Sequence, residues 1–153
     1  LGLEGPRAIH HLTSGKILIS DTRLKKWFSA EQMKIMKEAV EDHRASASHA
    51  PRSIYGKIVA EADRELEPDT VFRRTILYGR DHYPEMSMEQ QWDRFTEHLD
   101  NKYSNTGYIK LWIPGSENEK NLKVIRDYIN NRTALRALFD KIFNELNGNE
   151  AEQ

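Results

Sequence analysis

Hydrophobic side chains recur every three or four residues along most of this chain, a spacing that predicts amphipathic helices. The first helix is expected over residues 7–20, because Pro6 stands where a helix can begin without losing a backbone hydrogen bond. A short segment at residues 21–28 is expected to fold over the core. The buried face of the first helix should hold Ala8, Leu12, Gly15 and Ile19.

The next helix carries the clearest start signal. Ser29 and Gln32 have the spacing of a capping box, in which each side chain satisfies a free backbone N–H of the first turn. The helix should end near Arg44, because residues 45–52 are rich in Ser and Ala and contain a proline. Its inward stripe is Met33, Met36, Val40 and His43.

A third helix is expected to begin at Ser53, and four more helices are expected in the rest of the chain. They begin near Pro68, Ser87, residue 117 and residue 132, and residues 108–113 form an extended connector that is too short to make a sheet. The fold class is therefore expected to be all-α. The helix after Ser53 should bury Ile54, Ile58, Val59, Ala62 and Leu66; the next four should bury Val71, Phe72, Thr75, Ile76 and Tyr78; Met88, Trp92, Phe95 and Leu99; Leu122, Ile125 and Ile129; and Leu135, Leu138, Phe139, Ile142 and Leu146.

Composition excludes several classes of protein. The 23 basic and 24 acidic residues give a net charge of −1, which argues against a polycation that binds nucleic acid. No uncharged apolar run approaches the roughly 20 residues that span a bilayer, so no membrane partner is expected. The chain has no cysteine, hence no disulfide and no thiolate ligand. These features fit a cytoplasmic protein.

Three polar side chains fall on inward faces of three different helices. They are His11, His43 and Asp63, whereas His10 is expected to point toward the polar side of its helix. A buried carboxylate costs several kcal/mol unless it meets a cation or several donors. Two imidazoles and a carboxylate at one point would suit a divalent metal ion, which removes that cost.

Each of these residues also has a purely structural interpretation. An inward histidine is often a hydrogen-bonded core residue, and an aspartate near a helix end is often a cap or the partner of an arginine. Arg44 beside His43, and Arg64 beside Asp63, could supply such ion pairs. Only the convergence of the three residues favours a site.

Two longer segments resemble a known family. Residues 39–46 (AVEDHRAS) and 51–64 (PRSIYGKIVAEADR) resemble the C-terminal half of HD-domain proteins, which are all-helical, metal-dependent phosphohydrolases, and the likeness is greatest to small bacterial members. The pattern formed by His11, Gly15 and Leu18 is similar to the segment that adds a histidine in two-metal members. In that setting Gly15 allows two helices to approach closely.

The resemblance implies a site and a substrate class. Asp63 and His43 would be catalytic, and both would bind a divalent ion (Mn, Fe, Ni, Mg or Zn) together with His11. Lys57, Arg44 and Arg64 would contact a nucleotide or another small phosphoester. Lys57 on a solvated helix face and Arg64 as a brace for Asp63 are the structural alternatives.

The chain departs from the family pattern at one point. It contains no His-Asp dipeptide, and in relatives that pair precedes a loop like Leu1-Gly2-Leu3. We therefore expect the sequence to be a fragment whose preceding part carries the pair. Residues 1–153 are expected to form a single HD-like domain, with residues 1–66 as its core portion and residues 67–153 as a helical extension.

A second function stays open. Without the His-Asp pair, the chain could be a non-catalytic module that senses a nucleotide or binds a protein. The aromatic-rich residues 108–112 could serve as a lid or as the contact of a homodimer, although wedging the extension onto the core is the favoured role.

Overall fold

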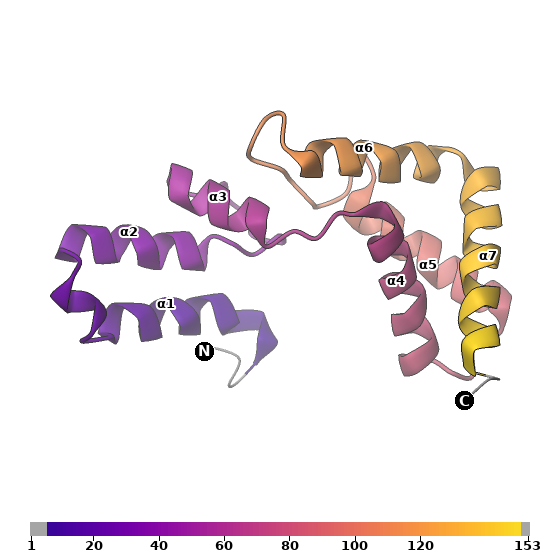
Figure 1. The fold of residues 1–153 in the computed structure, drawn as a ribbon, viewed down its shortest axis with the longest axis horizontal. Helices are drawn as coiled ribbons and strands as arrows, with labels where there is room; N and C mark the ends of the chain where they lie inside the picture. Colours follow the sequence, from indigo (N-terminus) through magenta and orange to yellow (C-terminus); the bar gives the residue numbers. More distant parts are fainter. Residues whose placement is uncertain (1–5, 151–153) are drawn as a thin grey trace. The chain divides into compact units, whose positions relative to one another are not determined.

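The computed structural model describes residues 6–150, and every regular element within that range is a helix. The expected all-α fold class is confirmed, because no strand occurs among these residues. Figure 1 labels the α-helices in chain order. The elements are η1 (Arg7–Ile9), α1 (His10–Ser20), η2 (Leu24–Lys26), α2 (Ala30–Glu41), α3 (Ile54–Ala62), α4 (Pro68–His82), α5 (Met88–Tyr103), α6 (Glu117–Asn130) and α7 (Arg132–Glu150).

The chain divides into two compact units. Unit 1 comprises the described residues up to Arg64 together with Lys110–Pro114, and unit 2 comprises Glu65–Ile109 and the described residues from Gly115 onward. The first division falls two residues before the boundary expected between residues 66 and 67. Unit 1 thus holds α1 to α3, and unit 2 holds α4 to α7.

Local capping starts several helices where the sequence indicates. The Ser29 hydroxyl accepts a hydrogen bond from Gln32 N at 3.2 Å, while Gln32 Oε1 accepts one from Ser29 N at 2.8 Å. Ser87 and Gln90 form the same reciprocal pair at the start of α5. Ser53 caps α3, because its hydroxyl accepts from Gly56 N. These starts depend on contacts within four residues, so the sequence predicts them well.

Unit 1 is built around α2, which packs against both α1 and α3. Helices α1 and α2 run antiparallel (Figure 1), so the start of α1 lies near the end of α2. A Cβ atom added to Gly15 would lie 2.8 Å from Cγ of Glu41, which confirms that this glycine permits a close helix approach. The fully buried hydrophobic side chains of unit 1 are small in number: Met33, Ala39 and Ala60.

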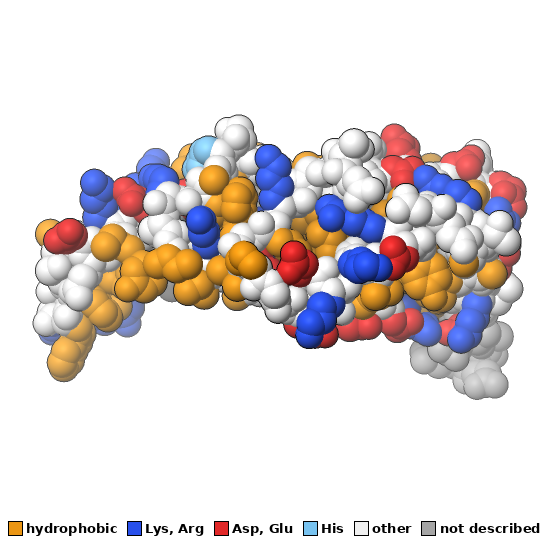
Figure 2. All heavy atoms as spheres, turned by 90° about the horizontal axis from the view of Figure 1, so that it is seen from above, with side chains coloured by type: hydrophobic (Ala, Val, Ile, Leu, Met, Phe, Trp, Pro, Cys, Tyr) orange, Lys and Arg blue, Asp and Glu red, His pale blue; other side chains and the backbone are white. Residues whose placement is uncertain are grey.

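Two of the expected buried faces in unit 1 are wrong. Ile54, Ile58 and Val59 of α3 are 57%, 51% and 39% exposed, and Figure 2 shows hydrophobic side chains gathered over the surface of unit 1. Leu12 of α1 is also exposed, as is Ala8. Helical spacing reveals that a hydrophobic stripe exists, but a neighbouring element must be present to bury it.

The C-terminal end of α3 also differs from the expectation. The helix stops at Ala62 with Asp63 as its C-cap, so Leu66 does not continue the α3 stripe. Leu66 is instead buried within unit 2.

Unit 2 has an aromatic core shared by four helices. Phe95 lies 6.1 Å from Phe72 and 5.3 Å from Phe139 between ring centroids, and all three rings are buried. Leucine and isoleucine side chains from α5, α6 and α7 complete this core, as their spacing predicts. Tyr78, expected inside, is instead 49% exposed.

Residues 108–113 form no strand, in agreement with their expected role as a connector. Within unit 1, Trp112 N donates a hydrogen bond of 2.9 Å to Oε2 of the buried Glu61. Within the described range, no helix combines the length and the apolar character needed to cross a membrane.

Candidate functional site

Three histidine rings cluster in unit 1 where the start of α1 meets the segment after α2. The His10 and His43 ring centroids are 5.1 Å apart, and His11 lies 5.7 Å from His10 and 6.4 Å from His43. Nε2 of His10 is 3.0 Å from Nε2 of His43, a hydrogen-bond distance. Nδ1 of His43 is in hydrogen-bond contact with the carbonyl oxygen of Val40. The structure therefore brings together the two expected histidines, His11 and His43.

His10 is a member of this cluster that the sequence analysis placed on the polar side. The expectation assumed one continuous helix from residue 7, whereas the α-helix begins at His10 itself after a 3₁₀ turn. Side chains of a helix tilt toward its N-terminus, so the first residue can reach beyond the helix end. Its ring consequently meets His43, which follows the end of α2. The sequence feature that could have identified His10 is its position beside His11, four residues after Pro6 and close to the expected helix start.

His11 is neutral near pH 7 and has an open bonding position. Burial lowers its pKa, and electrostatic interactions with Arg44, His10 and His43 lower it further, against a raising effect from Glu41. The buried Nδ1 atom of His11 has no hydrogen-bond partner among the residues that the structure describes. A buried polar atom in that state is costly unless a ligand or solvent meets it.

Asp63 does not join the histidines in the expected way. Its side chain is exposed at the C-terminal end of α3, so the prediction that it points into the interior is wrong. The cause is local: α3 ends at Ala62, immediately before Asp63, and much of the surface of α3 is exposed. Throughout residues 6–147, no group of three or more His, Asp or Glu side chains is arranged to hold a metal ion. The role of His11, His43 and Asp63 as a set of metal ligands stays a prediction.

An open cavity of about 520 Å³ lies beside the cluster. Its volume is within the usual range for small-molecule sites. His11 and Arg44 line it together with His49 and Arg52, and the rest of its wall comes from Leu12 of α1, Glu41 of α2 and the loop between α2 and α3. The cavity thus includes residues of both segments that resemble HD-domain proteins.

A buried ion-pair network shapes one wall of this cavity. The Asp42 carboxylate is almost fully buried and accepts hydrogen bonds from the Arg52 guanidinium at 2.8 Å and from Arg52 N at 2.7 Å. Arg52 also pairs with Glu41 at 2.9 Å, and Glu41 pairs with Lys37 at 2.6 Å. Because these two carboxylates neutralise the Arg52 guanidinium, the role of Arg52 is to hold the loop after α2 against α2.

The network keeps both carboxylates ionised. Burial alone would raise the pKa of Asp42, but the hydrogen bonds and charge of Arg52 bring it below its ordinary value. The pKa of Glu41 is lowered in the same way, with Lys37 and Arg52 outweighing burial. Sequence analysis missed both roles, although Glu41, Asp42 and Arg52 stand inside the segments that carry the resemblance.

Arg44 differs from Arg52. One of its guanidinium nitrogens donates to the carbonyl oxygen of Ala8, which ties the loop to the start of α1. Among the described residues, no carboxylate forms an ion pair with Arg44. Its charge is therefore available to an anion in the cavity.

Lys57 and Arg64 lie outside this cavity. Lys57 is half-buried on α3, and Arg64 is buried after the helix end. Burial lowers the pKa of Arg64, partly offset by the charges of Glu61 and Asp63. Their contact with a substrate stays a prediction.

Comparison with known proteins adds no assignment: no family model matches the chain, and no curated protein or solved structure matches it. The resemblance to HD-domain proteins accordingly stays a prediction from the residues that carry it.

Proposed function

We propose that this chain acts as a metal-dependent phosphohydrolase of the HD type on a nucleotide or another small phosphoester. The observation that carries the proposal is the pairing of the histidine cluster with an unneutralised arginine, Arg44, at the edge of the unit 1 cavity. Phosphate recognition commonly uses arginine, whose guanidinium donates two parallel hydrogen bonds to phosphate oxygens. The same cavity is walled by residues of the segments that resemble the family.

The chain's own residues support binding of the phosphoester directly. Arg44 can donate to phosphate oxygens while one of its nitrogens still bonds Ala8. The buried Nδ1 of His11 offers a further hydrogen-bonding position to the ligand. The Asp42–Arg52 pair keeps the loop in place, so that binding does not have to order it.

The metal part of the proposal needs more donors than this region supplies. Neutral imidazoles suit Mn, Fe, Ni or Zn better than Mg. The described residues nevertheless contain no set of three His, Asp or Glu side chains placed around one point. The cluster therefore does not by itself fit a resident ion, and the metal-binding roles of Asp63, His11 and His43 stay part of the proposal. A cytoplasmic location and a homodimer likewise stay predictions.

The missing donor set favours a second candidate function. A non-catalytic module that senses a nucleotide would use the same cavity without needing an ion. A module that binds a protein would use the exposed hydrophobic side chains of unit 1, such as Ile58 and Tyr55 of α3.

Hydrolysis and binding assays on the purified chain separate these functions. Release of phosphate from a panel of nucleotides is measured with Mn, Fe, Ni, Mg or Zn added singly, and thermal shifts are recorded with the same nucleotides and no metal. The phosphohydrolase predicts metal-dependent release that His43→Asn abolishes. Nucleotide stabilisation without hydrolysis in any ion supports the sensing module instead and contradicts the enzyme.

Arg44→Gln tests the cavity itself. Nucleotide binding should weaken at least tenfold, because the variant loses the only arginine on the cavity wall whose charge is not paired with a carboxylate among the described residues. Lys25→Gln, an exposed change of the same charge in unit 1, should leave binding unchanged. Equal binding by the two variants would exclude this cavity as the phosphoester site.

A further inference from the structure

Unit 2 contains an open cavity of about 460 Å³ that none of the expected site residues lines. It lies between the end of α4, the loop after it, the C-terminal half of α5 and Tyr108. Three tyrosines, Tyr78, Tyr83 and Tyr108, share its wall with Arg94 and Lys102. This combination of aromatic rings and cations has no role in the core of unit 2.

The three tyrosine side chains are partly exposed, although the Tyr78 ring is already stacked on the His82 ring, with their centroids 3.9 Å apart. Tyr78, Tyr83 and Tyr108 are 49%, 37% and 45% exposed, although they line one cavity. The Arg94 guanidinium carbon lies 5.8 Å from the Tyr78 ring centroid and 6.0 Å from that of Tyr83. Arg94 is thus held over both rings by cation–π contact. Flat aromatic faces next to a cation are suited to stacking with a planar ligand.

Close packing of α4 against α5 makes this wall rigid. A Cβ atom on Gly79 would lie 2.2 Å from Oε1 of Gln91, so any larger residue here would displace the Gln91 and Arg94 side chains. Gln91 is buried, and its side-chain nitrogen donates to the carbonyl oxygens of Gly79 at 3.1 Å and Tyr83 at 2.8 Å. Arg94 donates to the carbonyl oxygen of Thr75. The loop that carries Tyr83 is therefore tied to α5.

A second glycine positions Tyr108. A Cβ atom on Gly107 would lie 2.6 Å from the carbonyl carbon and oxygen of Lys102, which means that the chain folds back closely over the end of α5. Tyr108 N then donates to the carbonyl oxygen of Asn101 at 3.1 Å. These contacts fix the third tyrosine at the cavity without burying it.

The cavity is electropositive. Among the residues that the structure describes, neither Arg94 nor Lys102 forms an ion pair with a carboxylate, and Glu97 is the one acidic residue on the wall. The pKa of His98, which also lines the cavity, is consistent with this positive charge. Burial and the charges of Lys102, Arg94 and Arg74 lower it to about 4. His98 is therefore neutral at pH 7, and the two cations, Arg94 and Lys102, outnumber the single carboxylate on the cavity wall.

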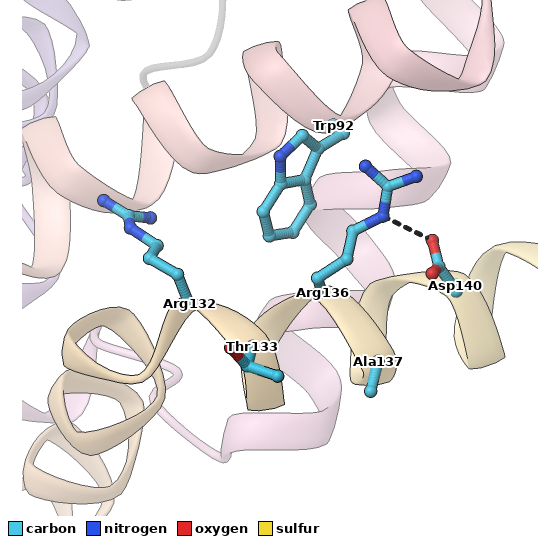
Figure 3. Close-up of a pocket in the computed structure, with 6 residues that line it drawn as sticks. All are labelled: Trp92, Arg132, Thr133, Arg136, Ala137 and Asp140. Carbon is cyan, nitrogen blue, oxygen red and sulfur yellow. Dashed lines mark hydrogen bonds and ion pairs between the residues drawn. The ribbon is translucent and has the colours of Figure 1, made fainter.

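Another cavity of unit 2 is lined by arginines that are paired with carboxylates. Figure 3 shows Trp92 between Arg132 and Arg136, with Arg136 bonded to Asp140. Arg132 also pairs with Asp100 at 2.6 Å, and Arg136 pairs with Glu89 at 2.5 Å. Those arginines already have anionic partners within the protein, whereas Arg94 and Lys102 do not.

We infer that the cavity lined by Tyr78, Tyr83, Tyr108, Arg94 and Lys102 binds a small ligand in which a planar aromatic ring is joined to an anionic group. Tyr83 and Tyr108 take the ring, Tyr78 forms part of the wall beside them while it stacks on His82, and Arg94 and Lys102 take the phosphate or carboxylate. Nucleoside monophosphates and aromatic carboxylates share this chemistry. The site is separate from the unit 1 cavity, and it does not depend on the proposed phosphohydrolase activity.

Calorimetric titration of the full chain tests the inference. The probes are AMP, adenosine, inorganic phosphate and phenylpropionate, which separate the ring from the charge and phosphate from carboxylate. AMP or phenylpropionate should bind saturably, and adenosine and phosphate should each bind at least tenfold more weakly than the better of the two.

Two variants locate the site. Lys102→Gln and Tyr108→Ala should each weaken binding at least tenfold, while Lys123→Gln, an exposed lysine of α6, serves as the control of equal charge change. Circular dichroism checks that the variants fold. Hydrogen exchange should show ligand protection at residues 78–86 and 97–108. Absence of saturable binding by every probe, or equal affinity in Lys102→Gln and Lys123→Gln, would overturn the inference.

Discussion

The two units bury hydrophobic surface to different extents. Of the fully buried hydrophobic side chains in the described part of the chain, three lie in unit 1 and fourteen in unit 2. Of the large hydrophobic side chains that are exposed in the same range, nine lie in unit 1 and five in unit 2. Burial of apolar surface is the main favourable contribution to folding. Unit 2 should therefore be the more stable of the two.

The buried charged side chains of the described residues, Asp42, Glu61 and Arg64, lie instead in unit 1. Unit 1 contains a nearly buried carboxylate, Asp42, bound by Arg52, as well as the three-histidine cluster. Buried polar networks position side chains more than they stabilise a fold. The comparison shows that the buried polar contacts of unit 1 lie at its cavity, whereas unit 2 is held together by a hydrophobic core.

The largest expected effect is a cavity in the core of unit 2. Phe95→Ala removes a fully buried ring that contacts Phe72 and Phe139, so unit 2 should lose about 3–5 kcal/mol. Met33→Ala in unit 1 should cost about 2 kcal/mol, because fewer buried side chains surround it. Urea unfolding followed by hydrogen exchange assigns each loss to its unit. A smaller loss for Phe95→Ala than for Met33→Ala would break the comparison.

The next effect is a dependence of the stability of unit 2 on pH, caused by His98. Unfolded His98 binds a proton near its ordinary pKa of 6.5, whereas folded His98 does so only near pH 4, so acid favours the unfolded state between these values. The stability of unit 2 should be complete above pH 6.5 and should fall by about 2–3 kcal/mol as the pH drops to 4.

Chemical unfolding at a series of pH values measures this loss. His98→Gln should flatten the dependence, and His82→Gln, which changes an exposed histidine of the same unit, should retain it. Equal slopes in the two variants would show that His98 does not cause the loss.

The third prediction concerns the polar network of unit 1. Asp42→Asn leaves Arg52 without its buried partner and should destabilise unit 1 by about 2 kcal/mol, less than for a fully buried pair because Arg52 is 41% exposed. Asp127→Asn removes a surface ion pair with Lys123 and should cost less than about 0.5 kcal/mol. Thermal unfolding of both variants provides the measurement. Similar losses would mean that burial of Asp42 is not the decisive difference.

The smallest effect should come from the exposed face of α3. Ile58→Ser changes a side chain that is 51% exposed, and we expect a change of about 0.5 kcal/mol or less. Ile76→Ser on α4, where the side chain is 1% exposed, should cost at least about 3 kcal/mol. Chemical denaturation of the pair sharpens the contrast between the units. A large loss in Ile58→Ser would show that this face is covered in solution.

Sequence reasoning about the candidate site succeeded for His11 and His43 and failed where a side chain's direction depends on the residue at which a helix begins or ends. His11 and His43 were expected to meet, and their rings are 6.4 Å apart. Asp63 was expected to join them, but α3 ends at Ala62, and the Asp63 side chain that follows is exposed. His10 was expected elsewhere, because its direction depends on where the α-helix begins after the 3₁₀ turn.

The amino-acid sequence by itself determined the helices of this protein. The Ser29–Gln32 and Ser87–Gln90 capping boxes and the proline at the start of α4 act within one helical turn, so their effect does not require the rest of the fold. Tertiary structure decided which hydrophobic stripes became core and which charges were neutralised. Phe95 is buried and Ile58 is exposed, and Arg132 is paired while Arg94 is not, because each outcome depends on elements distant in the chain. Helical periodicity has no information about those distant partners.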